Sequence, residues 1–141
     1  MSGDLKSMRY ELFAEQPTVE SYLNIRKECG LSQRSRVAAE KGLRNALFSV
    51  LVREGEEVIG MGRIIGDGGC WFQIVDVAVL PIHQGSGLGS RIMESLMAWL
   101  LEYAPKSSMV TLIADGKAAD LYARFGFQST QPHSHGMLMR L

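Results

Sequence analysis

The spacing of apolar positions indicates strands in the middle of the chain. Apolar side chains alternate with polar ones, or run almost unbroken, in residues 47–53, 58–65 and 71–80, as in half-buried and buried β-strands. The segments between them, Glu54-Gly55-Glu56-Glu57 and Gly66-Asp67-Gly68-Gly69, are typical turn sequences. The pattern therefore predicts three strands joined by tight turns into an antiparallel meander.

On either side of the meander the pattern changes to helical periodicity or to capping signals. Residues 90–103 carry apolar side chains at helical spacing, which predicts a helix. Thr18 is predicted to cap an earlier helix that ends at Gly30, and Ser32 to cap a second one that reaches about residue 43. A short helix is predicted over residues 117–125.

Four further apolar segments complete the predicted sheet, and they are residues 8–13, 109–114, 127–129 and 137–141. Together the segments predict a mixed α/β fold, with about seven strands in a mostly antiparallel central sheet and about four helices on its two faces.

Composition and charge narrow the class of protein. A chain of 141 residues is expected to form one domain, spanning 1–141. Its 15 basic and 15 acidic residues balance, so charge offers no support for a nucleic-acid or membrane partner. Cys29 and Cys70 form no metal-binding motif and are expected to be free thiols, and no metal is expected. Charged residues near the start and no long apolar stretch favour a cytoplasmic protein.

A loop with glycine at positions 85, 87 and 89 connects the last strand of the meander to the helix of residues 90–103. Glycine allows tight turns and a close approach of a ligand to the backbone. Amides at a helix N-terminus converge on one point, where the helix dipole favours negative charge. The loop is therefore predicted to bind a pyrophosphate, although a turn that only connects two elements is the alternative.

The glycine spacing argues against two common phosphate-binding motifs. A dinucleotide fingerprint needs G-x-G-x-x-G and a later acidic residue, and a P-loop needs Gly-Lys-Ser/Thr. Neither is present. The motif Gln84-x-x-Gly87-x-Gly89 instead resembles the Q/R-x-x-G-x-G/A motif of the GNAT acetyltransferases, and this resemblance implies that the loop holds the pyrophosphate of coenzyme A.

Residues 111–127 resemble a second element of that family, N-x-x-A-x-x-F/L-Y-x-x-x-G-F. The matching residues are Ala118, Leu121, Tyr122, Gly126 and Phe127, whereas Asp115 stands where the family usually has Asn. The resemblance is to small bacterial members of the family, and the C-terminal part is also similar to plant serotonin N-acetyltransferases.

The resemblance implies acetyl-coenzyme A as the acetyl donor. The residues expected to bind it are Val77, Ala78, Val79, Gln84, Gly85, Ser86, Gly87, Leu88, Gly89, Ser90, Asp115, Lys117, Ala118 and Tyr122. By the same resemblance, Tyr122 protonates the departing thiolate. The alternative for Tyr122 is a packed tyrosine whose hydroxyl finds a backbone partner.

Asp76 is the candidate general base. Alternation along residues 72–79 places it on the face of Phe72, Ile74 and Ala78. A carboxylate loses solvation there, which raises its pKa toward the range useful for proton transfer. A structural, hydrogen-bonded Asp76 is the alternative, with water removing the proton. His83 is expected to face solvent or phosphate. Arg26, Arg34 and Arg36 are expected to be solvated on their helices, and contact with an anionic substrate is the alternative.

The function predicted is direct transfer of acetyl to a primary amine in a ternary complex. The acceptor is a small-molecule amine or a protein amine, and the plant resemblance makes an arylalkylamine one option. The alternative function is a non-catalytic regulatory module that binds acyl-coenzyme A. The resemblance also implies a homodimer, because many relatives pair through their last strands.

Overall fold

The computed structural model describes residues 9–141 and centres on one five-stranded sheet. In sheet order the strands are β1 (Tyr10–Phe13), β2 (Phe48–Glu54), β3 (Glu57–Gly66), β4 (Trp71–Val79) and β5 (Met109–Thr111). β1 to β4 pair antiparallel, and β5 runs parallel to β4. The predicted meander is thus confirmed as β2, β3 and β4.

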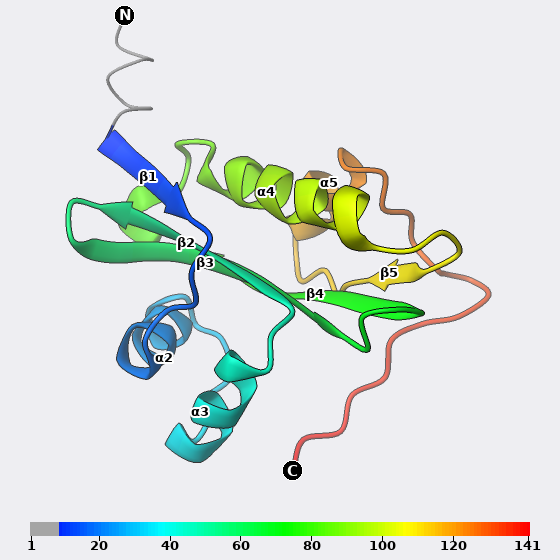
Figure 1. The fold of residues 1–141 in the computed structure, drawn as a ribbon, viewed down its shortest axis with the longest axis horizontal. Helices are drawn as coiled ribbons and strands as arrows, with labels where there is room; N and C mark the ends of the chain where they lie inside the picture. The colour runs from blue at the N-terminus through cyan, green and yellow to red at the C-terminus, as the bar shows by residue number, and fades with distance from the viewer. Residues whose placement is uncertain (1–8) are drawn as a thin grey trace, which may run out of the picture.

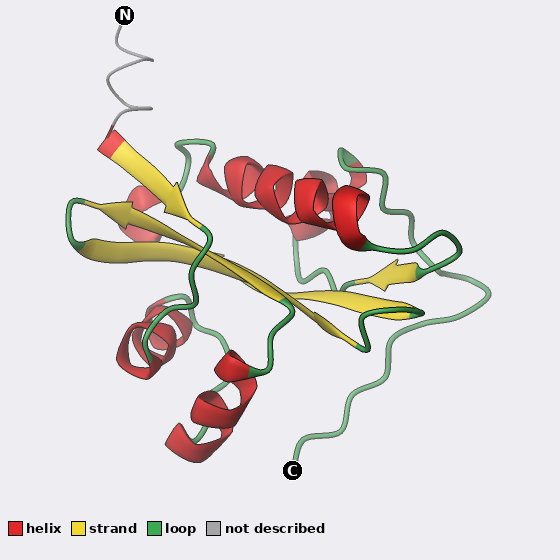
Figure 2. Cartoon of the chain, in the orientation of Figure 1, coloured by secondary structure: helices red, strands yellow, loops and turns green. Residues whose placement is uncertain are grey.

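Helices cover both faces of this sheet (Figures 1 and 2). They are α2 (Val19–Glu28), α3 (Arg36–Arg44), α4 (Leu88–Tyr103) and α5 (Ala118–Ala123), with a short 3₁₀ turn, η1 (Pro81–His83), after β4. α4 and α5 lie over one face and α2 and α3 over the other. The mixed α/β class is confirmed. No helix among residues 9–141 is long and apolar enough to cross a membrane.

The N-terminal predictions hold except for one cap. Thr18 caps α2 through its hydroxyl, which accepts a hydrogen bond from the amide of Ser21. α3, however, is capped by Ser35, not by Ser32. Ser32 is unavailable as a cap because its carbonyl and hydroxyl accept hydrogen bonds from Arg26. Met8, the first residue of the predicted opening strand, lies outside the described residues.

α4 packs closely on the sheet because its apolar residues repeat at helical spacing and because Gly62 leaves room for them. Leu88, Ile92, Leu96 and Leu100 are all buried, at successive i, i+4 positions. A Cβ on Gly62 would lie 2.7 Å from Cγ2 of Ile92, which no real contact allows. The short connection through η1 places the N-terminus of α4 close to the end of β4 in the chain.

The two predicted C-terminal strands, 127–129 and 137–141, do not form, so the sheet has five strands instead of about seven. A strand needs an edge to pair with. After α5 the chain passes beyond β5, makes a turn in which the amide of Ser134 donates to the carbonyl of Thr130, and ends on the α2 and α3 side of the sheet (Figure 1). Its last apolar side chains are exposed.

A β-bulge interrupts β4 at Asp76. Met61 pairs with Ala78 and Arg63 with Val75, so Asp76 and Val77 together face Gly62. Asp76 has a φ of 58°, a left-handed conformation that Asp tolerates better than most residues. The extra residue reverses the alternation, so Asp76 faces α2 whereas Phe72 packs against Trp99 of α4. The predicted shared face of Asp76 and Phe72 is therefore wrong.

Candidate active site

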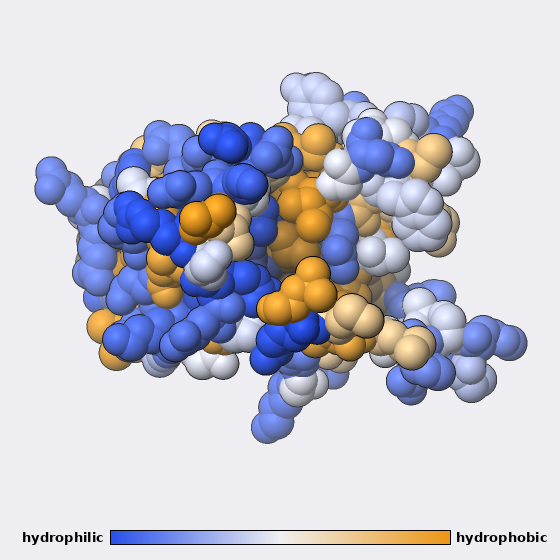
Figure 3. Space-filling model, turned by 90° about the horizontal axis from the view of Figure 1, so that it is seen from below, coloured by the Kyte–Doolittle hydropathy of each residue, from blue (hydrophilic) through white to orange (hydrophobic). Residues whose placement is uncertain are grey.

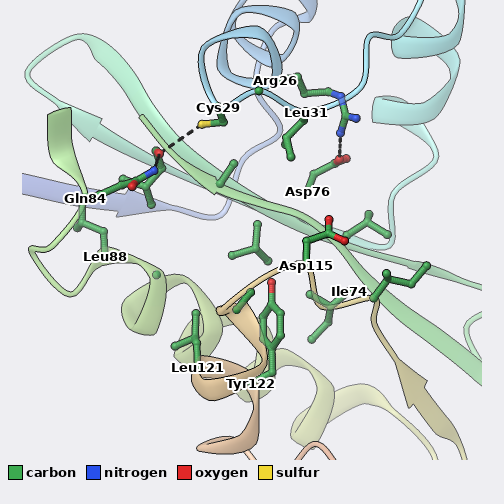
Figure 4. A pocket seen from close by; sticks show the side chains of 18 of the residues that line it. Arg26, Cys29, Leu31, Ile74, Asp76, Gln84, Leu88, Asp115, Leu121 and Tyr122 are labelled. Atoms are coloured by element: carbon green, nitrogen blue, oxygen red, sulfur yellow. Dashed lines mark hydrogen bonds and ion pairs between the residues drawn. The ribbon is translucent and has the colours of Figure 1, made fainter. Parts of the chain in front are cut away.

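A cleft of about 910 Å³ opens where β4 and β5 part. The two strands pair only from Trp71↔Met109 to Gln73↔Thr111. Beyond Gln73 this edge of β4 has no strand partner among the described residues, and residues 74–79 line the cleft. The cleft reaches the glycine loop and α5 on one side and the end of α2 on the other (Figure 4). Viewed from the α2 and α3 side, an apolar hollow lies beside hydrophilic surface (Figure 3).

The glycine loop presents backbone amides to the cleft. Gly85 and Gly87 have φ values of 83° and 78°, which side chains other than glycine adopt only with strain. Gly87 is the N-cap of α4 and provides no side-chain cap. Within residues 9–141, the amides of residues 85–90 have no hydrogen-bond acceptor. Unpaired amides at the start of a long helix suit an anionic ligand such as a pyrophosphate.

Gln84 closes the end of the open β4 edge. Its side-chain amide donates to the carbonyl of Val79 at 2.9 Å, and the Cys29 thiol donates to the same oxygen at 3.3 Å. The carbonyl of Val79 therefore lies on the open edge, and in an antiparallel strand the amide of the same residue points the same way. That amide is free to donate to a carbonyl in the cleft, as expected for the acyl group of a thioester.

Tyr122 extends from α5 into the cleft, with its hydroxyl directed toward β4 (Figure 4). Burial, and secondarily the charge of Asp115, raises the pKa of Tyr122 above its ordinary value of 10.0. The phenol therefore keeps its proton throughout the neutral range and can donate a hydrogen bond. Phe127 packs edge-on against the ring at a centroid distance of 6.4 Å and helps to hold it.

Most of the residues predicted to bind the donor line this cleft, and two do not. Asp115 and Ala118 line it, together with residues 77–79 and the loop from Gln84 to Ser90 except Ser86. Ser86 and Lys117 are exposed and lie outside the lining. Arg124, which the sequence did not single out, lines the donor side, and its guanidinium lies 3.5 Å from the hydroxyl of Ser90.

Asp76 lies at the centre of a buried cluster of charged and polar groups. Its carboxylate accepts hydrogen bonds from Nη1 of Arg26 at 2.5 Å, Nε of Arg63 at 2.6 Å and the hydroxyl of Tyr22 at 3.0 Å. The exposed fractions of the Arg26, Arg63 and Asp76 side chains are 7%, 15% and 8%. Both guanidinium groups also lie near the face of the Tyr22 ring. Three donors on one carboxylate favour the structural alternative for Asp76.

The expectations of a solvated Arg26 and of a solvent-facing His83 are wrong, whereas a phosphate-adjacent His83, which lines the cleft, stays a prediction. Arg26 is buried rather than solvated, because α2 brings it over the bulge. His83 is 3% exposed rather than solvent-facing, because η1 turns it toward β1, where its Nδ1 lies 2.9 Å from the hydroxyl of Tyr10. The sequence holds a signal for Arg26: it follows the buried residues Tyr22 and Ile25 at helical spacing, on the core side of α2.

The prediction that both cysteines are free thiols is confirmed. Cys29 and Cys70 are both free, and His133 and His135 are exposed. Burial raises the pKa of the Cys29 thiol above its ordinary value, so this thiol is a poor nucleophile at neutral pH.

Comparison with known proteins decides the family. The profile of the Acetyltransferase (GNAT) domain matches residues 44–129, more than half of the chain. The chain belongs to the GNAT acetyltransferase family. A GNAT profile that covers β2 to α5 includes the open β4 edge, the glycine loop and Tyr122, so the motif resemblances and the family match agree.

Solved structures extend the GNAT match over nearly the whole fold. A protein of unknown function from meticillin-resistant Staphylococcus aureus, described as a probable acetyltransferase, is 47% identical, with a TM-score of 0.90 over 94% of this chain and 99% of that one. A GNAT family acetyltransferase from Brucella melitensis, solved in complex with acetyl-CoA, is 19% identical, with a TM-score of 0.64 over 85% of this chain and 83% of that one. The second similarity concerns the fold alone.

Among curated proteins the GNAT chain matches plant acetyltransferases. Histone acetyltransferase TAP1 of Glycine max is 34% identical over 84 residues, which are 60% of this chain and 36% of the plant protein. The chain thus spans about a third of the length of this curated relative.

Proposed function

We propose that this chain transfers the acetyl group of acetyl-coenzyme A directly to an amine in a ternary complex. The observation that carries the proposal is the meeting of three features in one cleft: the unpaired amides of residues 85–90, the open edge of β4 and the hydroxyl of Tyr122. A pyrophosphate, an acyl carbonyl and a sulfur atom are the groups that these features suit.

The donor fits the cleft in both size and chemistry. Coenzyme A is long and carries phosphates at one end, and a cleft of about 910 Å³ bordered by helix-terminal amides can hold such a molecule. Arg124 adds a cation near the loop. When bound, the donor supplies an activated thioester. The amide of Val79 then holds its carbonyl oxygen, and Gln84 fixes the strand end from which that amide extends.

The reaction requires two proton movements. The amine nitrogen bonds to the acetyl carbon, the carbon–sulfur bond breaks, the nitrogen loses a proton and the thiolate gains one. Tyr122 is the group we assign to the sulfur, since its raised pKa keeps the hydroxyl protonated and able to donate. The three donors on Asp76 lead us to propose that it positions the bulge, while water carries the amine proton away.

The alternative, a module that binds acyl-coenzyme A without turnover, requires the glycine loop but not Tyr122. A tyrosine hydroxyl directed into the cleft with no hydrogen-bond partner among the described residues favours the enzyme (Figure 4).

We also propose a homodimer in the cytoplasm. Met137 and Met139 are 88% and 84% exposed, and a second copy would cover them. The two free cysteines suit a reducing compartment. Light scattering of the purified protein tests the dimer, and a monomer at micromolar concentration would contradict it.

Thermal unfolding with acetyl-coenzyme A, coenzyme A or NADPH tests the donor. A ligand at a hundredfold excess over Kd stabilises the folded state by about 2.7 kcal/mol, which raises Tm by several degrees for a domain of this size. We expect both coenzymes to raise Tm and NADPH to leave it unchanged. Thiol release on a panel of amines then tests turnover. Stabilisation without release on any amine would favour the regulatory module, and no stabilisation would refute the proposal.

A further inference from the structure

We propose that the acceptor amine carries an anionic group, most simply a carboxylate, and that Arg34 and Arg140 bind it at the α2 side of the cleft. The proposal rests on the proposed acetyl transfer and specifies its substrate class. It follows from the distribution of charge along the cleft, which the zero net charge of the whole chain conceals.

The carboxylates that line the cleft are Asp76 and Asp115, whereas the lining holds four arginines: Arg26, Arg34, Arg124 and Arg140. Arg124 lies near Ser90 on the donor side. The other three belong to α2, to the segment before α3 and to the C-terminal segment, which Figure 1 shows reaching the α2 and α3 side of the sheet. Positive charge therefore gathers where an acceptor enters opposite the donor loop.

Asp76 does not neutralise this charge. It is shared by two guanidinium groups, those of Arg26 and Arg63, so the buried cluster retains one formal positive charge. Tyr22 adds no negative charge to the cluster, because burial, and secondarily Asp76, raises the pKa of its hydroxyl and keeps it protonated. The cluster thus repels a cation at the acceptor end rather than attracting one.

Arg34 is held in place for binding. Its Nη1 donates to the hydroxyl of Ser32 at 2.8 Å and to the carbonyl of Gln33 at 3.1 Å. Ser32 is itself fixed by Arg26, whose Nε and Nη2 donate to the Ser32 carbonyl at 2.9 and 2.7 Å. Nε and Nη2 of Arg34 have no partner within residues 9–141, and together they form the planar pair of donors that fits a carboxylate.

Arg140 supplies the second cation. It forms no ion pair and no side-chain hydrogen bond with any described residue, and it lines the cleft together with Leu138. Arg34 and Arg140 are far apart in the sequence, and only the course of the C-terminal segment brings both to this cleft.

Asp115 places a negative charge near Tyr122, where we propose that the acetyl group is transferred. It lines the cleft near Tyr122, whose pKa its charge helps to raise. The cleft is therefore negative beside the group that we assign to the sulfur and positive at its α2 side. An acceptor with an ammonium group at one end and a carboxylate at the other, such as an amino acid, matches this pattern. A polyamine does not match it.

Acceptors paired by charge provide the test. Thiol release is measured on amino acids, on the corresponding amino acid amides and on spermidine. We expect kcat/KM for the acids to exceed that for the amides by roughly ten- to a hundredfold, the range of a charge-assisted hydrogen bond. Arg34→Gln and Arg140→Gln should each reduce this ratio through KM while the amides react as before.

Arg36→Gln is the matched control. Arg36 is an exposed arginine on α3 that pairs with Glu20 and Glu40 and does not line the cleft. Its replacement should leave the acid-to-amide ratio unchanged. An equal loss in all three variants would overturn the assignment, because it would indicate a general effect of surface charge.

Binding separates this proposal from the proposed function. With the protein saturated by coenzyme A, an amino acid should raise Tm further than its amide does, and Arg34→Gln should remove the difference. If amines are acetylated without any preference for the acids, the charge proposal fails and the acetyltransferase stands. If no amine is acetylated but the Tm difference appears, the anion site stands and the proposed acetyltransferase activity fails. If the acids are not preferred and the Tm difference is also absent, the anion site is overturned.

Discussion

The two sides of the cleft are built from the chain in different ways. The donor side comes mainly from two short stretches, residues 77–90 and residues 115–124, whose motifs can be recognised locally. The acceptor side joins Arg26, Arg34, Asp76 and Arg140, from segments spread over the chain. A phosphate site needs consecutive amides, so its residues are neighbours in sequence. A charged acceptor site needs side chains from different directions, and the fold must bring them together.

The largest effect expected on activity is at the donor side. Tyr122→Phe removes the hydroxyl directed into the cleft and should lower kcat by roughly 10²- to 10⁴-fold, the range for one general acid. The Kd of acetyl-coenzyme A should change little, since the amides of the loop remain. Steady-state thiol release and calorimetry measure the two quantities. Tyr103→Phe, at an exposed tyrosine of α4, is the control. Full activity of Tyr122→Phe would remove Tyr122 from the mechanism.

The largest effect expected on stability is at the acceptor side. Asp76→Asn leaves the buried Arg26 and Arg63 guanidinium groups without a countercharge, and breaking such a buried pair costs about 3–5 kcal/mol. Urea unfolding measures this loss. Glu20→Gln, which breaks an exposed pair with Arg36, should change the free energy of unfolding little.

A pH profile of Asp76→Asn distinguishes its two candidate roles. If Asp76 positions the bulge, the folded variant keeps the shape of the wild-type pH–rate profile at a lower rate. Loss of the acidic limb of the profile would instead make Asp76 the base.

A smaller effect separates backbone strain from ligand binding in the glycine loop. Gly87 and Gly68 have φ values of 78° and 80°, and a Cβ on either would meet no atom within 4 Å. Alanine at either position should therefore cost a similar amount, roughly 1–2 kcal/mol. Only Gly87→Ala should also weaken the binding of acetyl-coenzyme A, because its Cβ would occupy the proposed phosphate site. Calorimetric titration measures the affinity, and an equal Kd for the two variants would contradict the assignment of the loop.

The smallest effect expected lies at alkaline pH and involves both sides. Burial raises the pKa of Tyr22 and of Tyr122 above 10.0. The folded state therefore keeps these protons to higher pH than the unfolded state does. Their contribution to stability is complete below pH 10.0 and is lost as pH rises through the folded pKa values. Urea unfolding at increasing pH should show this decline, and Tyr22→Phe or Tyr122→Phe should make it shallower. An unchanged slope in both variants would contradict it.

The sequence alone predicted the elements whose signals are local. The meander follows from alternation and two glycine turns, α4 from its apolar repeat, and the glycine loop from its position between a strand and a helix. Such features depend on neighbours within a few residues. The strand predictions for residues 127–129 and 137–141 failed for the complementary reason: apolar composition allows a strand, but one forms only where the chain runs along a sheet edge, and these two segments do not.

Asp76 and Arg140 show what only the tertiary structure decided. One extra residue opposite Gly62 turns Asp76 from the α4 face to α2, where Arg26 and Arg63 occupy its carboxylate. The course of the C-terminal segment brings Arg140 to the cleft. Strand register and chain path depend on the packing of distant segments, which no local pattern encodes. The sequence by itself therefore indicated a GNAT-like fold with a glycine loop, and the three-dimensional arrangement determined which charged side chains line its cleft.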